Sequence, residues 1–285
     1  MSTVEDGDPG PWVDYARSER EPWQSRTGIV KFLEFVVPVD GMSERAFHIY
    51  CQRHHSAHVM NITEFSQFMR KYNTGHRLPG ATVNLPAALA HEHPLVGGAE
   101  VWLNSIEEVE TWLGKPVYES LIRPDELRFI AQDGSAQIMV GKENRIIDDN
   151  PDLEEQNRLK LYLLARRPAG TDYDSFHEKL ATDARELLLQ PAIRGLLAKA
   201  VVTHRLRDPL PAGFETMPLD AVVELWPRDA DALRSLCSTD AFAAWTSVLA
   251  AMTQEAPRAL VARMHVVHDE FSFQPSLTQP LTFTW

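Results

Sequence analysis

Three histidines, His54, His55 and His58, fall within five residues of one another. Imidazole titrates near neutral pH, so a histidine can accept a proton in one step and return it in the next. Stepping about 100° per residue from Phe47 places His54 and His58 on the apolar face of a helix, with Tyr50 and His55 beside that face. Histidines on a face that should be hydrocarbon predict a pocket, with His55 and His58 as candidate catalytic residues and His54 and Tyr50 as ligand contacts.

A strand predicted over residues 68–78 supplies the other candidate groups. Tyr72 and His76 share one face of this strand because alternate side chains point the same way. A tyrosine hydroxyl can hold an oxygen on which negative charge develops, so Tyr72 is the third candidate catalytic residue. His76, the neighbouring Asn73 and Trp102 are candidate substrate contacts, although Asn73 should point to the opposite face. The alternative is that these side chains only fill the space between helix and sheet.

A metal centre is a weaker interpretation of the same histidines. His54 and His58 stand four residues apart, a spacing at which two imidazoles can share a metal ion. A third ligand would have to come from a loop, where His91 and His93 are available. The H-E-x-x-H signature of zinc hydrolases is absent, and we expect no metal.

Composition limits the possible partners. The 285 residues carry a net charge of −12 and are 44% hydrophobic. An acidic chain lacks the basic footprint that nucleic acid requires and has no attraction to an anionic membrane. The two cysteines, Cys51 and Cys237, are far apart, which fits a reducing compartment better than a disulfide framework. We therefore expect a cytoplasmic protein that binds neither nucleic acid nor membrane.

The predicted strands and helices that position the candidate residues follow one another in the same order in both halves of the chain. The first half is predicted as strand, helix, two strands, helix and strand, and the same order starts again after an acidic break, DDNPDLEEQN. This is the ferredoxin-like pattern, and two such units can close into an eight-stranded barrel. The predicted division is an N-terminal arm 1–26, a first repeat 27–147 with the site, a linker 148–157, a second, degenerate repeat 158–268 and a tail 269–285.

These features resemble the EthD family of the dimeric α+β barrel superfamily. The resemblance rests on Phe47, Tyr50 and His55-Ser56 in the helix, on Tyr72 in the strand, and on the pair Asp125-Glu126 followed by Phe129. It implies a tandem fusion in one chain, a pseudo-dimer whose second half has lost the site. His55 becomes the first candidate for the base because it matches the family position, whereas Asp125 and Glu126 are also explained as turn residues.

The resemblance and the histidines together predict an enzyme. The expected reaction is that of a lyase or isomerase (dehydratase, decarboxylase or cyclase) acting on an aromatic or polyketide-like molecule by proton transfer, without an organic cofactor. Two alternatives remain: a haem-binding protein or cofactor-free oxygenase of the same superfamily, and a non-catalytic protein that binds a hydrophobic ligand. The partner is expected to be a phenolic or other aromatic small molecule, and the chain a monomer or homodimer.

Overall fold

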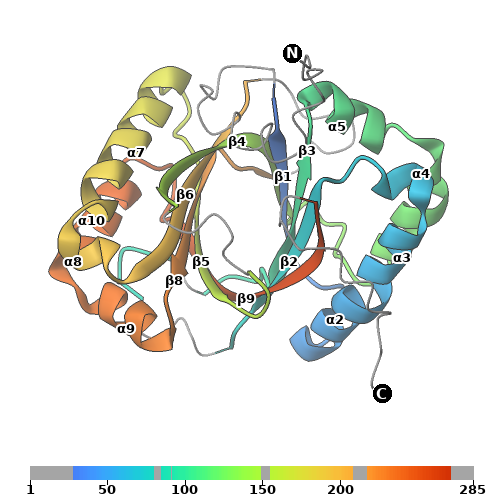
Figure 1. Ribbon diagram of the computed structural model, residues 1–285, viewed down its shortest axis with the longest axis horizontal. Coiled ribbons are helices and arrows are strands. Elements are labelled where there is room, and N and C mark those ends of the chain that lie inside the picture. The colour runs from blue at the N-terminus through green and yellow to red at the C-terminus, as the bar shows by residue number, and fades with distance from the viewer. Residues whose placement is uncertain (1–27, 80–84, 91, 149–154, 208–216, 271–285) are drawn as a thin grey trace, which may run out of the picture.

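The strands form a closed barrel in which alternating residues point inward and outward. The computed structural model describes residues 28–79, 85–90, 92–148, 155–207 and 217–270. Eight strands follow one another around the barrel in the order β1-β3-β2-β9-β5-β8-β6-β4, and β4 pairs with β1 to close it. A ninth strand of only two residues, β7 (Met217–Pro218), runs parallel to the start of β4. The predicted eight-stranded barrel is confirmed, with the described helices outside it (Figure 1).

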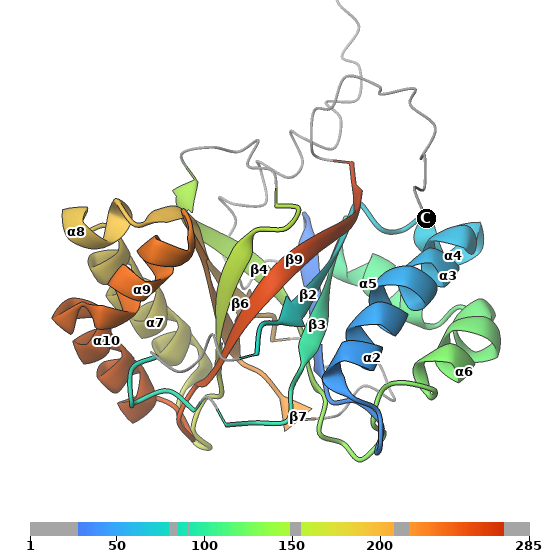
Figure 2. The same ribbon diagram turned by 90° about the horizontal axis from the view of Figure 1, so that it is seen from below.

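The first half supplies four strands and one group of helices. Its strands are β1 (Val30–Val36), β2 (Lys71–Arg77), β3 (Gly97–Leu103) and β4 (Gln137–Asp148). Its helices are α2 (Glu44–Tyr50), α3 (Ser56–Asn61), α4 (Thr63–Ser66), α5 (Ile106–Leu113) and α6 (Arg123–Glu126), with two π-helical turns, η1 (Cys51–His55) and η2 (Tyr118–Ile122). These helices cover one side of the barrel (Figure 2).

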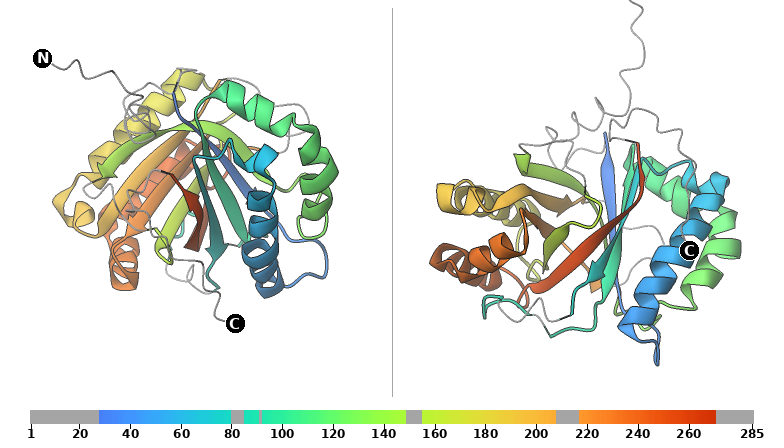
Figure 3. Two further views of the ribbon diagram at one scale, coloured as in Figure 1. Left: turned by 45° about the vertical axis from the view of Figure 1, so that its right-hand side comes forward. Right: turned by 60° about the horizontal axis from the view of Figure 1, so that its bottom comes forward.

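The second half covers the opposite side in the same order of elements. Its strands are β5 (Leu159–Ala165), β6 (Leu197–Arg205), β8 (Ala221–Pro227) and β9 (Arg258–Asp269). Its helices are α7 (Tyr173–Leu188), α8 (Pro191–Arg194), α9 (Ala230–Ser238) and α10 (Asp240–Ala251). Figure 3 shows the two helical groups separated by the strands. A duplication as the origin of the two halves stays a prediction.

The helix that leads into the site begins at a serine cap. Ser43 caps α2 by accepting a hydrogen bond from the Ala46 amide at 3.2 Å, which satisfies one of the unpaired amides of the first turn. Ser105 caps α5 in the same way through the Glu108 amide at 3.3 Å. The predicted arm 1–26 lies outside the described residues, as do most of the predicted linker and tail. None of the described helices has the length and apolar character needed to cross a bilayer.

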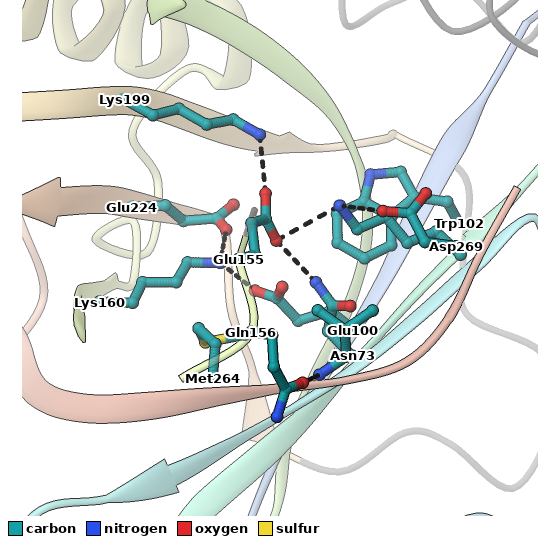
Figure 4. A network of polar contacts seen from close by, with 12 residues as sticks. Asn73, Glu100, Trp102, Glu155, Gln156, Lys160, Lys199, Glu224, Met264 and Asp269 are labelled. Carbon is teal, nitrogen blue, oxygen red and sulfur yellow. Dashed lines mark hydrogen bonds and ion pairs between the residues drawn. The ribbon is translucent and has the colours of Figure 1, made fainter. Parts of the chain in front are cut away.

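The inside of the barrel is unexpectedly charged. Lys31 and Lys160 are fully buried there and both contact Glu100 and Glu224. Glu155, from the segment that joins the two halves, reaches Lys199 at 3.0 Å and Lys71 at 3.3 Å (Figure 4). Buried charges are tolerated when each is paired, so this network replaces the hydrocarbon interior of an ordinary small barrel.

Candidate active site

A cavity separates the helices of the first half from the outer face of the sheet. Its empty space is about 430 Å³, including its opening to solvent. Its wall is mostly aromatic and aliphatic, with five residues that carry titratable groups: Glu34, His55, Tyr72, Tyr118 and Glu126. The other lining residues are Phe32, Val59, Phe65, Met69, Ala99, Val101, Trp112, Leu113 and Ile122. The predicted pocket between helix and sheet is therefore present.

His55 lies at the end of η1 and is almost completely buried. Its Nδ1 is 2.9 Å from Oδ2 of Asp125, on α6, and its ring packs against Phe129 with 4.8 Å between the ring centroids. A carboxylate accepts a hydrogen bond, so Nδ1 carries the proton of the neutral imidazole and Nε2 carries the lone pair. No described residue is hydrogen-bonded to Nε2. This ring therefore offers a base to a ligand in the cavity.

Asp125 holds the His55 ring in this orientation, and a second hydrogen bond holds Asp125 in place. The Tyr50 hydroxyl donates to Asp125 Oδ1 at 2.6 Å, while Oδ2 takes the bond from His55. The bond from His55 lowers the pKa of Asp125 to about 2, and the bond from Tyr50 adds to this shift. Asp125 is therefore ionised at neutral pH and stabilises the imidazolium that forms when His55 takes a proton. Tyr50, predicted as a substrate contact, is instead a positioning residue for this pair.

Tyr72 reaches the cavity from β2. It is buried, and burial raises the pKa of its phenol well above the usual value. The phenol therefore stays protonated and can donate a hydrogen bond to a ligand oxygen. The structure thus brings together His55 and Tyr72, two of the three residues predicted as catalytic.

Two carboxyl groups share the cavity with His55, and sequence reasoning passed over one of them. Glu34 enters from β1, and Glu126 enters from α6. Glu126 accepts hydrogen bonds from the Tyr118 hydroxyl at 2.9 Å and from Arg123 at 3.3 Å. Burial raises the pKa of Glu34 to about 8, and the charge of Glu126 adds to the rise. The sequence signal for Glu34 is one acidic residue within a strand, GIVKFLEFVV, that is apolar apart from Lys31.

The structure corrects the prediction that His58 and His54 face the pocket. The π-helical turn η1 holds about one more residue than an α-helical turn, so the residues after it are displaced by about one position around the helix. His55 thereby takes the place that an uninterrupted α-helix gives to His54. His54 is exposed beside the ring of Tyr50, and His58 Nε2 bonds to the Leu121 carbonyl at 3.1 Å.

Three predicted substrate contacts also lie away from the cavity. Asn73 and Trp102 point into the barrel, where Asn73 donates to Glu155 at 2.8 Å and the Trp102 indole donates to Glu143 at 3.2 Å. His76 shares the outward face of β2 with Tyr72 but lies beyond the cavity, with its ring 4.8 Å from that of His48. Burial lowers the pKa of His76 to about 3, so this side chain stays neutral. Asn73 thus points to the opposite face, as its place in the strand suggests, and none of the three residues lines this cavity.

The proposed metal ligands do not meet either. Within the described ranges no group of three or more His, Cys, Asp or Glu side chains is arranged to hold a metal ion. His93 bonds through Nε2 to the Ala259 carbonyl at 3.0 Å, and His91 lies outside the described residues.

The second half has the same strand register without these polar groups. Glu34 pairs with Ala99 and Ile138, whereas Leu163 pairs with Val223 and Ala259 at the corresponding places. Tyr72 pairs with Val101 as Ala200 pairs with Leu225. The residue that the sequence pattern aligns with His55 is Ala184, on the uninterrupted helix α7. All three counterparts, Leu163, Ala200 and Ala184, lie in one hydrophobic core, so the fold itself does not need Glu34, Tyr72 or His55.

The match to a known family lies in the first half, which carries the cavity. Residues 39–133 match the model of the EthD domain, and that range includes His55, Tyr72 and Asp125. The fold is similar to a solved structure described as an anthrone oxidase-like protein, with a TM-score of 0.54, 9% identity, and coverage of 86% of this chain and 96% of that chain.

Two further structures are similar at lower scores. A putative monooxygenase from Fusobacterium nucleatum has a TM-score of 0.48 and 7% identity over 85% of this chain and 94% of its own. A mutant chlorite dismutase from Candidatus Nitrospira defluvii has a TM-score of 0.41 and 11% identity, covering 87% of this chain and 95% of its own. No curated protein matches the chain. Residues 39–133 thus resemble the EthD domain, in a chain that shares its fold with the anthrone oxidase-like protein.

Proposed function

We propose that this protein is an enzyme that removes a proton from a small aromatic ketone or phenol held in the cavity. The observation that carries this proposal is the buried contact of 2.9 Å between His55 Nδ1 and Asp125 Oδ2, with the other ring nitrogen left to a ligand. A histidine held by an ionised carboxylate is a general base of the kind that accelerates proton transfer by about 10²–10⁴-fold. Such a step needs no organic cofactor.

The groups around His55 suit an aromatic ligand with an oxygen. Phe32, Phe65 and Trp112 contribute rings to the cavity wall, and rings pack favourably on other rings. Tyr72 supplies a phenolic donor for an oxygen that becomes negative when the proton leaves. After deprotonation, the carbanion or enolate can lose a hydroxyl or rearrange, which is the lyase or isomerase chemistry expected from the sequence.

A second outcome is reaction of the deprotonated ligand with oxygen. The specific observation in its favour is the similarity of fold to the anthrone oxidase-like protein. For anthrone the balanced reaction is C₁₄H₁₀O + O₂ → C₁₄H₈O₂ + H₂O, in which the methylene carbon is oxidised to a carbonyl and O₂ is reduced to water. Proton removal from that methylene group comes first, so both outcomes use the same base.

The haem alternative fits the cavity less well. The empty space of about 430 Å³ includes the opening to solvent and is shared by the carboxyl groups of Glu34 and Glu126. That space is small for a porphyrin, and His54 and His58 are turned away from it. The lining of the cavity therefore does not fit haem.

Exchange of deuterium into anthrone tests the proposal. Under argon in D₂O, the wild-type protein should speed loss of the methylene proton signal, and His55→Asn should remove this acceleration. His58→Asn, on the same helix but bonded to a backbone carbonyl, is the matched control and should exchange like wild type. Oxygen uptake after admission of air then separates the oxygenase outcome from the lyase or isomerase outcome. Equal exchange by wild type and His55→Asn would contradict the proposal.

A further inference from the structure

Glu34 is a carboxyl group without an internal partner. It lines the cavity together with His55, and its carboxyl makes no hydrogen bond or ion pair with another described residue. Glu34 is half-buried, so its carboxyl loses part of its contact with water without gaining a partner in the described protein. A group left unpaired at the wall of a cavity points to a partner that arrives with the ligand.

The surroundings of Glu34 keep it neutral. The neighbouring carboxylate of Glu126 repels a second negative charge, whereas the Arg123 guanidinium favours it. Burial and Glu126 prevail and raise the pKa of Glu34 to about 8, so the carboxyl carries its proton at pH 7. The other titratable groups around it, on η1, β2 and η2, are Cys51, His55, Tyr72 and Tyr118. A protonated carboxyl is a hydrogen-bond donor, not an ion-pair partner.

The second half shows that the fold does not require a carboxyl here. Leu163 occupies the same register position on β5 and is completely buried in the core of that half. A leucine at this place is therefore compatible with the barrel. A glutamate at the same place in the first half lowers the stability of the folded protein. Residues that lower stability at a cavity wall are expected where function needs them.

We propose that Glu34 selects the ligand by donating a hydrogen bond to a neutral carbonyl or hydroxyl oxygen. This inference rests on the proposed function and names the substrate class: an uncharged aryl ketone or phenol, with its oxygen at Glu34 and its acidic hydrogen at His55. For a ketone, the C–H bond beside the carbonyl breaks, the proton goes to His55 Nε2, and the electron pair moves onto the carbonyl oxygen that Glu34 holds. For a phenol, the O–H bond breaks instead, and its proton goes to His55 while its electron pair stays on the oxygen. Glu34 is thus a specificity-determining residue as well as a stabiliser of the developing charge.

The same arrangement excludes charged ligands. Glu126 remains paired with Arg123 and Tyr118, and it leaves the cavity without a free cation among the described lining residues. An aromatic carboxylate would place its charge beside a carboxylate in an apolar space, where like charges repel strongly. The cavity should therefore prefer 1-indanone to the otherwise similar 1-indanecarboxylate.

Ligand-observed NMR titrations with 1-indanone test this inference without any turnover. The ketone does not titrate, so a pH effect on its binding reports on the protein. Wild-type affinity should fall about five- to ten-fold between pH 6 and pH 9.5, as Glu34 loses its proton, which is the loss expected for one hydrogen bond. Glu34→Gln, which keeps a donor, should bind with no such fall. Glu34→Leu should bind about five- to ten-fold more weakly than wild type at pH 6.

Indane, which has the same ring without oxygen, is the control ligand and should bind all three proteins with similar affinity at every pH. The inference is overturned if wild type does not bind 1-indanone, if its affinity does not change with pH, or if Glu34→Leu binds the ketone like wild type. Failure of the proposed function looks different: deuterium exchange would be unaffected by His55→Asn while the 1-indanone results held, and the cavity would then be a binding site only.

Discussion

Asp125 has two effects on His55 that a substitution can separate from ligand binding. It sets the tautomer that leaves Nε2 as the acceptor, and its negative charge stabilises the imidazolium. It does not line the cavity itself. Asp125 therefore affects the reaction only through His55 and makes no direct contact with the ligand.

Asp125→Asn should lower turnover about 100-fold or more while the affinity for 1-indanone stays within about two-fold of wild type. An asparagine can present an amide N–H to Nδ1 and so favours the wrong tautomer. Steady-state rates with anthrone and the NMR titration provide the two readouts. A parallel fall in both quantities would show that Asp125 supports the cavity wall rather than the base.

Glu34 should lower the stability of the folded protein, with a characteristic pH dependence. Its pKa of about 8 lies above the usual 4.5, so the folded chain keeps a proton that the unfolded chain releases between these values. Stability therefore decreases as pH rises from about 4.5 to 8. Glu34→Leu should raise the free energy of unfolding in urea by about 1–3 kcal/mol at pH 8 and by less at pH 5. The mirror variant Leu163→Glu should destabilise, and a destabilised Glu34→Leu would contradict this account.

His55 could be predicted from the sequence, but its partners could not. The family resemblance favours His55, whereas the projection onto an α-helix favours His54 and His58. Asp125 and Glu126 were visible as a motif with an adequate explanation as turn residues. Glu34 was read as part of a strand, because nothing in one sequence tells a solvent-facing glutamate from one that faces a cavity. These roles depend on contacts between residues 70 to 92 positions apart in the chain, which local patterns do not contain.

Two π-helical turns, η1 and η2, give the helices of the first half the irregular geometry that forms the site. The π-helical turn η1 ends at His55, and the turn η2 lies across from it, joined by the bond from His58 to Leu121. Wide turns of this kind are rare and are frequent at functional sites. The corresponding helix α7 has none and carries no cavity-facing histidine. A π turn cannot be recognised from periodicity, so the α-helical projection assigned the wrong faces.

Deleting Arg53 tests the role of this turn. Arg53 is exposed within η1, and its loss should let the segment become a continuous α-helix. The side chain of His55 would then move by about one position around the helix, away from Asp125. We expect cooperative unfolding to persist and proton exchange in anthrone to fall to the level of His55→Asn. Alanine at position 53, which keeps the length, is the control and should exchange like wild type.

The barrel as a whole depends on charges that meet only when it closes. Lys71 from the first half and Lys199 from the second half both contact Glu155, which Asn73 also contacts (Figure 4). The sequence predicted eight strands from apolar runs in a repeated order of elements, but it did not predict this interior. A lysine in a strand is normally read as facing solvent, and its buried partner lies on another strand far along the chain.

Glu155→Gln should therefore destabilise the protein by about 3–5 kcal/mol at pH 7, because it takes the carboxylate away from buried Lys199, whereas Lys71 keeps Asp269 at 3.2 Å. Those lysines hold the pKa of Glu155 well below its usual value despite its burial. Its contribution is present above the unfolded value of about 4.5 and is lost as pH falls below it. Urea unfolding should thus show a wild-type advantage that shrinks below pH 4.5. Glu178→Gln, at an exposed position on α7, should have almost no effect.

The central claim is that His55 presents an unprotonated Nε2 to the cavity while Asp125 holds Nδ1. Long-range ¹H–¹⁵N NMR of histidine side chains at pH 7.5, assigned with His55→Asn, measures this directly. The account predicts the Nδ1–H tautomer for His55 and a change in its Nε2 signal when 1-indanone is added, with no change at His58. A proton on Nε2, or an Nε2 signal that is indifferent to the ligand, would contradict the account.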